Sequence, residues 1–398
     1  MSETCDILIS GGGIAGLTAA AAFGSAGFHV ICVDPTPPVT DGDSDGADLR
    51  STAMLQPARD LLERAGLWET LAPHAAPLQV MRIIDAGGEV PEPRVVKEFD
   101  AADISDAPFG WNFPNWLLRR EMLARLADLP TVDFRPGVGT TTLFTRTAEA
   151  RVGLSDGTRV RTHLVIAADG RGSPMRQAAG IGVRTQTYGQ RALVFAVTHP
   201  LPHGNISTEV HRTGGPFTLV PLPDRDGQPC SAVVWMDDAA ATQARERMDV
   251  AEFEAEASTR CCEVFGPLTL VSRRQSWPIS TQHAERLTGE RLALIAEAAH
   301  AMPPIGAQGL NMSLADIATL LDLAEARREG LGDQEMLDAY DRARFGDIQL
   351  RVRGIDMLNR ASQVRAPLLR DARAIGLRAL YAAAPVRRML MQMGLGAR

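Results

Sequence analysis

Two glycine-bearing segments near opposite ends of the chain have the residue types and spacing to bind a cofactor. Residues 11–16 carry Gly11, Gly13 and Gly16 in a GxGxxG pattern, and residues 303–311 read PPIGAQGLN. A glycine-rich turn at the start of a helix offers backbone N–H groups to a pyrophosphate. The second segment has the pattern of a stiff loop that runs into a helix. Together the two segments predict one large cofactor that is bound at both ends.

The residues around the first segment supply the strands and the helix that such a turn requires. Residues 6–10 form an apolar run typical of a buried strand, residues 14–27 continue with Ala and Leu spaced like a packed helix, and residues 28–33 form a second strand. The second strand ends at Asp34, whose carboxylate can accept hydrogen bonds from a ribose 2′-OH. The pattern predicts a dinucleotide site and favours FAD over an ordinary strand-to-helix turn. The predicted pyrophosphate-binding residues are Gly11, Gly13, Ile14, Ala15 and Gly16.

Two further strand ends carry acidic residues. The apolar run 164–168 is followed by Asp169 and Gly170, and the run 291–295 is followed by Glu297 and then His300. In an open α/β sheet, groups at the carboxyl ends of strands bind the ligand. Asp169 also suits the capping of a helix. His300 is a candidate general base, although a hydrogen bond that ties the neighbouring loop is the favoured role.

Composition excludes several other classes of protein. The 398 residues carry a formal net charge of −7, which provides no basic field for nucleic acid. The cysteines lack metal-ligand spacing, so we expect no metal site and reduced thiols. The first strand begins by residue 6 and no apolar run approaches the length that spans a bilayer. We therefore expect a cytoplasmic protein that is neither secreted nor transmembrane.

The order of these motifs resembles a known family. GxGxxG, then ADGRGS at residues 168–173, then AEAAHAMPPIGAQGLNMSLAD at residues 296–316 is similar to the class A flavoprotein aromatic hydroxylases, the single-component FAD monooxygenases of the 4-hydroxybenzoate hydroxylase type. PPIGAQGLN, residues 48–55 and an arginine-rich tail are most similar to the ubiquinone-biosynthesis hydroxylases. The resemblance covers essentially the whole chain.

The resemblance implies an α/β fold with three parts. A Rossmann-like FAD-binding domain would comprise residues 1–75, 98–182 and 274–345. An inserted antiparallel β-sheet, formed by residues 76–97 and 183–273, would bind the substrate, since runs such as 192–199 and 217–222 partly alternate between apolar and polar residues. Residues 346–398 would form a helical C-terminal region. Phe195, Phe217, Leu219 and Trp235 are candidates for the wall of the substrate cavity, with ordinary core packing as the more frequent role.

The resemblance also assigns roles to individual residues. Asp34 would bind the adenosine ribose, Glu297 the ribityl chain, and Arg50 would lie near the pyrophosphate and the nicotinamide entry. Asp169 and Gly170 match the Asp-Gly motif that contacts FAD. Pro303, Pro304 and Gly306 would position the loop at the flavin without any acid or base chemistry. A helix that starts near Asn311 would direct its positive end at the flavin. The remaining residues expected to contact FAD are Gly309, Leu310, Asn311, and Asn115 or Arg119.

Two departures from the family pattern concern this site. The family's Gly-Asp pair is replaced here by Ala296 and Glu297, which lengthens the carboxylate by one methylene and removes the backbone freedom of glycine. At the start of the central helix, both Asn115 and Arg119 fit the family's motif, and the sequence leaves both registers open.

The activity that the resemblance implies is hydroxylation of an aromatic ring. NADPH or NADH would reduce FAD, O2 would give a C4a-hydroperoxyflavin, and oxygen would pass to a polyprenylated phenol or quinone precursor of ubiquinone. The alternatives are a hydroxylase of a small soluble phenol or polyketide, and an inactive flavin-binding partner in a biosynthetic complex. A homo-oligomer is compatible with the sequence.

The C-terminal tail differs in charge from the rest of the chain. Residues 361–398 contain seven Arg and one Asp, hence a local charge of +6, interleaved with Leu, Ile and Met at roughly helical spacing. This pattern suits an amphipathic helix at the inner face of a membrane or against a quinone-biosynthesis complex. The alternative is a helix that packs on the core and exposes its arginines.

Overall fold

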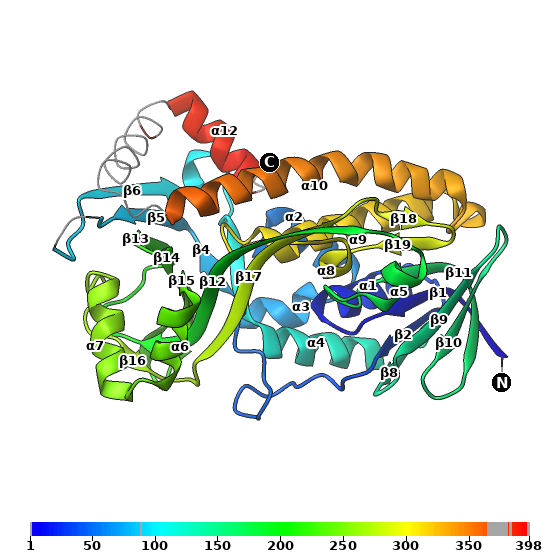
Figure 1. Ribbon diagram of the computed structural model, residues 1–398, viewed down its shortest axis with the longest axis horizontal. Helices are drawn as coiled ribbons and strands as arrows, with labels where there is room; N and C mark the ends of the chain where they lie inside the picture. The colour runs from blue at the N-terminus through cyan, green and yellow to red at the C-terminus, as the bar shows by residue number, and fades with distance from the viewer. Residues whose placement is uncertain (1, 88–89, 364–380, 382–383, 396–398) are drawn as a thin grey trace.

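The computed structural model describes residues 2–87, 90–363, 381 and 384–395. Its elements are arranged around two large β-sheets, and the long helix α10 (Gln334–Ser362) runs along both of them (Figure 1). Strands β12 (Val183–Thr198) and β17 (Gln275–Ala284) are long enough to reach from one sheet to the flank of the other. The predicted boundary between residues 345 and 346 falls inside α10, which therefore belongs to both parts of the fold.

The first sheet is the predicted Rossmann-like sheet. Strands β19, β11, β1, β2 and β8 run parallel in that order, and β18 adds an antiparallel edge. The strands β9 and β10 extend β11 as a hairpin. The bounds are β1 Ser2–Ser10, β2 Val30–Asp34, β8 Val132–Pro136, β9 Thr140–Thr145, β10 Ala150–Leu154, β11 Arg159–Ala167, β18 Thr288–Gly289 and β19 Leu292–Leu294.

Helix α1 (Ile14–Ser25) connects β1 to β2 and is buried on almost every side. Its alanines allow close packing against α4 (Asn115–Ala127) and α9 (Gln308–Ala326). A helix that is apolar all round is stable only when neighbours cover it, as here. The turn that precedes α1 is therefore held between the buried end of β1 and a helix that is buried up to its last residue.

The second sheet is the predicted substrate-binding sheet. Its strand order is β20-β17-β12-β15-β14-β13-β5-β6, with antiparallel pairs except for the parallel pair β13 and β5. Strand β17 lies in the portion 274–345 that was assigned to the FAD-binding domain, so pairing with β12 shifts that boundary. The remaining bounds are β5 Val80–Asp85, β6 Val95–Asp100, β13 Ile206–His211, β14 Pro216–Arg225, β15 Gln228–Asp238, β16 Thr269–Leu270 and β20 His300–Ala301.

One face of the second sheet packs on helix α7 (Val250–Arg260) through an aromatic cluster. Phe195, Phe217, Leu219 and Trp235 all belong to this cluster, together with Phe253 of α7. They are buried core residues and do not line a cavity. Side chains of the opposite parity on β12 and β15, such as Ala192, Val234 and Met236, pack with Ile305.

Shorter elements complete the fold. Strands β3, β7 and β4 form a small third sheet. Along the chain, each of these strands comes between strands of the two large sheets. These strands span Ser51–Leu55, Gly110–Pro114 and Ala76–Leu78. The remaining helices are α2 Gln56–Arg64, α3 Trp68–Leu71, α5 Pro174–Ala178, α6 Ala239–Arg247, α8 Ala296–Ala299 and α12 Ala384–Leu395.

Candidate active site

The glycines of the first turn have two distinct structural roles. Gly11 has a φ of +108°, and a Cβ on it would lie 2.3 Å from the carbonyl oxygen of Ala168. A Cβ on Gly16 would lie 1.8 Å from the carbonyl oxygen of Gly11. At Gly13, by contrast, a Cβ would meet nothing within 4 Å. The first two glycines are therefore required by packing, whereas Gly13 faces open space at the start of α1.

The start of α1 suits an anionic ligand. Gly13 caps the helix without any side-chain hydrogen bond, and the first turn, which includes Ile14 and Ala15, contains no acidic residue. The helix N-terminus therefore presents N–H groups and a positive dipole that no carboxylate in the turn neutralises. A pyrophosphate fits this turn on chemical grounds.

Asp34 lies beside the same turn, at the end of β2. Its carboxylate accepts hydrogen bonds from the backbone N–H groups of Gly12 at 2.6 Å and Thr36 at 2.7 Å. A carboxylate has about four acceptor sites, so sites remain for a ribose hydroxyl. The carboxylate is held at the edge of the glycine turn, as the dinucleotide prediction requires.

Asp169 and Gly170 follow β11 after one residue, Ala168. The Asp169 carboxylate accepts hydrogen bonds from the Ser173 hydroxyl at 2.5 Å and from the backbone N–H of Met175 at 3.1 Å. Burial raises the pKa of Asp169, and these hydrogen bonds oppose the rise. Asp169 therefore stabilises the start of α5, where Ser173 is the N-cap. The helix-capping role is present in the structure, and a role toward FAD remains a prediction.

Arg50, Asn115 and Arg119 converge on Asp48. Arg50 makes two hydrogen bonds to Asp48, at 2.8 and 2.7 Å, and Asn115 donates one at 3.0 Å. Burial favours the neutral acid, yet the donors from Arg50 and Asn115 and the charge of Arg119 hold the pKa of Asp48 below its usual value. Arg50 also stacks on Trp277 of β17, 5.0 Å from the ring centre. The sequence showed Asp48 only as a neighbour of Arg50, whereas it is the centre of the cluster.

Asn115 and Arg119, the two alternatives for the family's residue at the start of the central helix, both contact Asp48. Asn115 begins α4 and is buried; its amide donates to Asp48 and accepts a hydrogen bond from the Thr52 hydroxyl at 2.8 Å. Arg119 lies one turn further along and contacts Asp48 at 3.4 Å with a side chain that is 20% exposed. Asn115 is thus committed to the protein, and Arg119 retains donors for a ligand.

Ala296 and Glu297 lie where β19 runs into α8. Ala296 has a φ of +54°, a left-handed conformation that costs an L-residue about 1 to 2 kcal/mol and that glycine adopts freely. The family's glycine is thus replaced at a position whose backbone still has the glycine geometry. Glu297 is half-exposed and pairs with Arg171 at 3.2 Å. Burial lowers the pKa of Arg50, but the hydrogen bonds and charge of Asp48 and the charge of Glu297 together raise it above its ordinary value.

The loop 303–307 leads into α9, which begins at Gln308 rather than near Asn311. Gly306 and Ala307 both have left-handed backbones, with φ of +64° and +55°. The first turn of α9 contains no acidic residue, and Gly309 within it faces open space. Pro303 is buried, whereas Pro304 is exposed and Leu310 is half-buried.

Asn311 connects this helix to β3. Its amide donates to the carbonyl oxygens of Ala53 and Ala307, both at 2.7 Å, and its oxygen accepts from the N–H of Leu55 at 2.9 Å. The side chain is therefore fully used by the protein backbone. Its role is to fix α9 against the strand that follows Arg50.

His300 lies in a buried ionic cluster. Its Nε2 is 2.6 Å from Asp316, which also accepts a hydrogen bond from Arg344 at 2.8 Å, and the side chains of His300 and Asp316 are completely buried. This pairing connects β20, α9 and α10 and supports the interpretation of His300 as a loop tie. Sequence reasoning missed the roles of Asp316 and Arg344, although Asp316 ends the segment 296–316 that carries the family resemblance.

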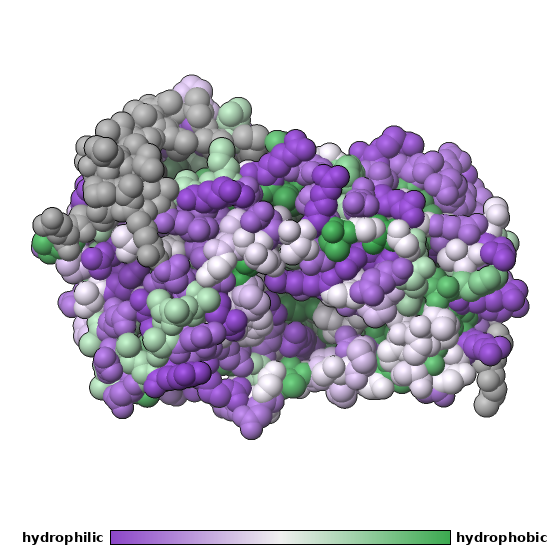
Figure 2. All heavy atoms as spheres, in the orientation of Figure 1, coloured by the Kyte–Doolittle hydropathy of each residue, from purple (hydrophilic) through white to green (hydrophobic). Residues whose placement is uncertain are grey.

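The face of the second sheet that is turned to the loop is apolar where it meets Ile305. Ile305 packs with Val234 against a cluster of Ala192, Met236 and Ile279. Figure 2 shows a hollow near the middle of the viewed face of the molecule, with hydrophobic residues in it. This wall, rather than the aromatic cluster on the other face, is the one that a substrate at the loop would contact.

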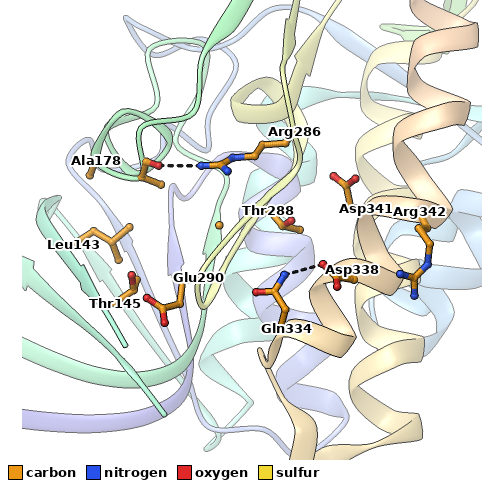
Figure 3. Close-up of a pocket in the computed structure, with 12 residues that line it drawn as sticks. Leu143, Thr145, Ala178, Arg286, Thr288, Glu290, Gln334, Asp338, Asp341 and Arg342 are labelled. Carbon is orange, nitrogen blue, oxygen red and sulfur yellow. Dashed lines mark hydrogen bonds between the residues drawn. The ribbon is translucent and has the colours of Figure 1, made fainter. Parts of the chain in front are cut away.

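A separate cavity of about 620 Å³ lies away from these residues (Figure 3). It is bounded by the β9 hairpin, the end of α5, β18 and the start of α10, and it includes Arg286, Glu290, Asp338 and Arg342. Its lining is largely polar and contains none of the predicted site residues. It suits neither a flavin nor a hydrophobic substrate.

Within the part of the chain that the structure describes, no helix is long and apolar enough to cross a bilayer. Among the same residues there is no group of three or more His, Cys, Asp or Glu side chains that could hold a metal ion.

Comparison with known proteins agrees with this architecture. A family model described as an FAD binding domain matches residues 4–351. The ubiquinone hydroxylase UbiL of Rhodospirillum rubrum is 32% identical over 397 residues, which cover 99% of this chain and 90% of that protein. The 3-demethoxyubiquinol 3-hydroxylase of Escherichia coli is 27% identical over 398 residues, or 99% of each chain.

Solved structures share the fold. The p-nitrophenol 4-monooxygenase PnpA of Pseudomonas putida superposes with a TM-score of 0.79 at 20% identity, covering 100% of this chain and 99% of that one. The sheets and the glycine turn thus define a flavin monooxygenase fold of the 4-hydroxybenzoate hydroxylase type. The chain belongs to the FAD-binding monooxygenases, in which it is related to the ubiquinone hydroxylases.

Proposed function

We propose that this protein hydroxylates the aromatic ring of a polyprenylated phenol or quinone precursor in ubiquinone biosynthesis, with FAD as cofactor, NADH or NADPH as electron donor and O2 as co-substrate. The observation that carries the choice of substrate is the apolar wall opposite the flavin loop. This wall is formed by Ala192, Met236 and Ile279 with Tyr188, Val234 and Ile305 packed against them, and no charged side chain belongs to the cluster. A carboxylated substrate would need a cation there, whereas a prenyl chain gains from apolar contact. The names of the two relatives above also refer to ubiquinone compounds.

The site residues would hold FAD along its whole length. Gly13, Ile14 and Ala15 would donate N–H groups to the pyrophosphate, Asp34 would accept from the ribose, and Glu297 would accept from the ribityl chain. Arg50 and Arg119 provide positive charge near the phosphates. The start of α9, with its dipole and its exposed Gly309, would lie toward the negative side of the flavin ring. When bound, FAD supplies the electron-transfer and oxygen-transfer chemistry.

The loop and the apolar wall would position the substrate at the flavin and exclude water from it. The loop is held rigid by Pro303 and Pro304, by Gln308 donating to the carbonyl of Gly306 at 2.9 Å, and by Asn311. The apolar wall covers the space in front of the loop. A dry, fixed pocket limits the loss of reduced oxygen as H2O2 before it reaches the substrate.

Substrate preference tests this function. With FAD-loaded protein, a short-chain prenylphenol should stimulate NAD(P)H oxidation and be hydroxylated with a higher kcat/KM than a small carboxylated phenol. The opposite preference would identify a hydroxylase of soluble phenols. Stoichiometric FAD without hydroxylation of either substrate would identify a non-catalytic flavin-binding partner.

Peripheral contact with a membrane is part of the proposal, since a polyprenyl substrate partitions into the bilayer. Much of the basic tail, including residues 364–380, lies outside the described residues. On α10, Leu350 is 70% exposed and Met357 is 68% exposed, and their spacing of seven places both on one helical face beside the exposed Arg353. On α12, Met389 is 50% exposed and Arg388 is exposed, whereas Arg387 binds Asp103. Apolar and basic side chains together suit an anionic lipid surface.

Liposome co-sedimentation checks this contact. Binding should require anionic lipid, fall with salt, and drop when Arg353 and Arg388 are both replaced by Glu. The matched control is Arg146→Glu on the exposed β9–β10 hairpin, which should sediment like the parent. If the double variant also sediments like the parent, lipid contact is wrong; self-association that disappears in Leu350→Gln would instead identify a homo-oligomer interface.

A further inference from the structure

An acid–histidine pair on β13 is not used by any step described so far. Nε2 of His211 lies 2.6 Å from Oε1 of Glu209, and the two side chains are only 16% and 10% exposed. The residues are two apart on a strand, so they share one face of the sheet. Val210 between them points to the other face and belongs to the aromatic cluster on α7.

The pair lies on the face that is turned to the flavin loop. Glu209 is opposite Thr218 on β14, and Thr218 is opposite Val234 on β15. Val234 packs in the cluster that contains Ile305. The row from Glu209 to Val234 crosses two strand spacings, roughly 10 Å, which is the scale of a substituted phenol ring. Thr218 and Val234 are only half-buried, so the row is open along its length.

The hydrogen bonding of the pair leaves Nδ1 of His211 without a partner among the described residues. An ionised Glu209 can only accept, so in the neutral imidazole Nε2 carries the hydrogen and Nδ1 carries the lone pair. Nδ1 is buried and has no hydrogen-bond partner among the residues that the structure describes. A buried acceptor without a donor is unfavourable, and a ligand hydroxyl would satisfy it. The carboxylate fixes the tautomer and would stabilise an imidazolium, which is the arrangement of a general base.

Other charged groups near the pair are accounted for. Asp85 on β5 lies opposite His211 in the parallel register, and it pairs with Arg94 at 3.1 Å. On the other side, β14 presents Pro216 opposite His211 and Thr218 opposite Glu209, neither of which titrates. Glu209 is therefore the carboxylate that contacts His211 directly.

We propose that the Glu209–His211 pair is the general base that removes the proton from the phenol hydroxyl of the substrate. The inference rests on the proposed function, because it requires a phenol in front of the loop. The phenol O–H bond breaks, an Nδ1–H bond forms on His211, and the electron pair that stays on oxygen raises the electron density of the ring carbon that is to be hydroxylated. After oxygen transfer, that carbon loses its hydrogen as a proton to water. The ring oxygen takes the proton back from Nδ1, which restores the aromatic ring and the neutral histidine.

Two variants that remove the base test the pair in the FAD-loaded protein with a short-chain prenylphenol: His211→Asn and the isosteric Glu209→Gln. Both should retain flavin and NAD(P)H oxidation, while product formation at pH 7 falls on the order of 100-fold and H2O2 rises. Product formation should recover as the pH approaches about 10, the ordinary pKa of a phenol, because the substrate then ionises without a base. The control His163→Asn changes an exposed histidine on β11 and should match the parent.

The absorbance of the bound phenol gives a second readout that does not depend on turnover. In the parent, the phenol should bind as the anion at a pH well below its pKa in water, and in His211→Asn it should bind neutral. A parent that hydroxylates the phenol together with variants of equal rate, pH profile and bound-phenol spectrum would overturn the general-base role and leave the proposed function intact. A parent that hydroxylates no phenol would overturn both.

Discussion

The turns after β1 and after β19 follow two strands of the same parallel sheet, and both contain a residue with a positive φ. That residue is a glycine in the first turn and an alanine in the second. After β1, Gly11 takes the positive φ and Gly16 gives the space, and a Cβ at either position would overlap a carbonyl oxygen. After β19, the left-handed position is held by Ala296, whose methyl group is buried without such an overlap. The first turn is fixed by sterics, whereas the second tolerates a side chain at the cost of local strain.

This difference indicates which substitutions the cofactor site can absorb. At the first turn, packing depends on Gly11 and Gly16, whereas the approach of a ligand depends on Gly13. Mutations can therefore change the stability of the fold and the binding of FAD separately. At the second turn, the backbone remains glycine-like and the change concerns mainly the length of the Glu297 side chain. We therefore expect FAD binding to survive the replacement of the family's Gly-Asp pair.

The largest contrast is expected between two glycines three residues apart. Gly16→Ala should lower the free energy of unfolding of the FAD-free protein by at least about 3 kcal/mol, because its Cβ overlaps backbone that cannot move. Gly13→Val should leave that free energy within about 1 kcal/mol and abolish FAD binding, because the side chain fills the space of the pyrophosphate. Denaturant unfolding and flavin absorbance measure the two effects. Stoichiometric FAD in Gly13→Val would remove Gly13 from the cofactor site.

At the second turn, Glu297→Gln should weaken FAD binding by about 1 to 3 kcal/mol through loss of a charge-assisted hydrogen bond. Glu297→Asp is the matched control and should bind FAD at least comparably, since it restores the family's residue. Titration of the FAD-free protein followed by flavin fluorescence gives both dissociation constants. Equal affinity in the Gln variant and the parent would mean that the carboxylate does not contact the ribityl chain.

The buried carboxylate of Asp48, which binds Arg50 and Asn115, is expected to make stability depend on pH. The pKa of Asp48 is lowered in the folded state, so the unfolded chain binds more protons in the acid range. The free energy of unfolding therefore decreases as the pH is lowered. The contribution is present above the ordinary pKa of about 3.9 and is lost below it. Asp48→Asn should therefore flatten the loss of stability between pH 5 and 3, roughly, in urea unfolding. An unchanged slope would show that the carboxylate does not stabilise the fold.

The smallest effect tests the strain itself. Ala296→Gly should stabilise the protein by about 0.5 to 1 kcal/mol, because relief of the left-handed alanine exceeds the entropy cost of glycine. Ala298→Gly in the same short helix is the matched control; it should destabilise, since its backbone is helical and its methyl group is buried. Thermal unfolding compares the two. Destabilisation of equal size in both variants would contradict the strain at Ala296.

The glycine turn, its strands and the terminal Asp34 could be predicted from sequence because each depends on local residue types and spacing. The parallel sheet around the turn was predicted for the same reason. The geometry of Ala296 could not be predicted from local residue types, because an alanine there suits an ordinary helix; the only signal is the glycine that the family has at this position. Its turn is held by contacts from elsewhere, including Arg176, which donates to the carbonyl of Ala298 at 2.8 Å.

The apolar wall opposite the flavin loop shows a second limit of prediction from sequence. Strands β12, β14 and β15 carry apolar residues on both faces, so periodicity alone does not reveal which face meets the flavin loop. The choice depends on α7, which covers the face of Phe195 and Trp235. The start of α9 at Gln308 has a similar cause, since Asn311 binds the backbone of β3 instead of capping the helix.

The transfer of isotopically labelled oxygen tests the account most directly. The FAD-loaded protein is supplied with NADPH or NADH, 18O2 and a short-chain prenylphenol, and the product is examined by mass spectrometry. We predict a ring-hydroxylated product that contains one 18O atom, with NAD(P)H oxidation that rises when the phenol is added. A product without label, or NAD(P)H oxidation that yields only H2O2 with every phenol offered, would contradict the assignment as an aromatic hydroxylase.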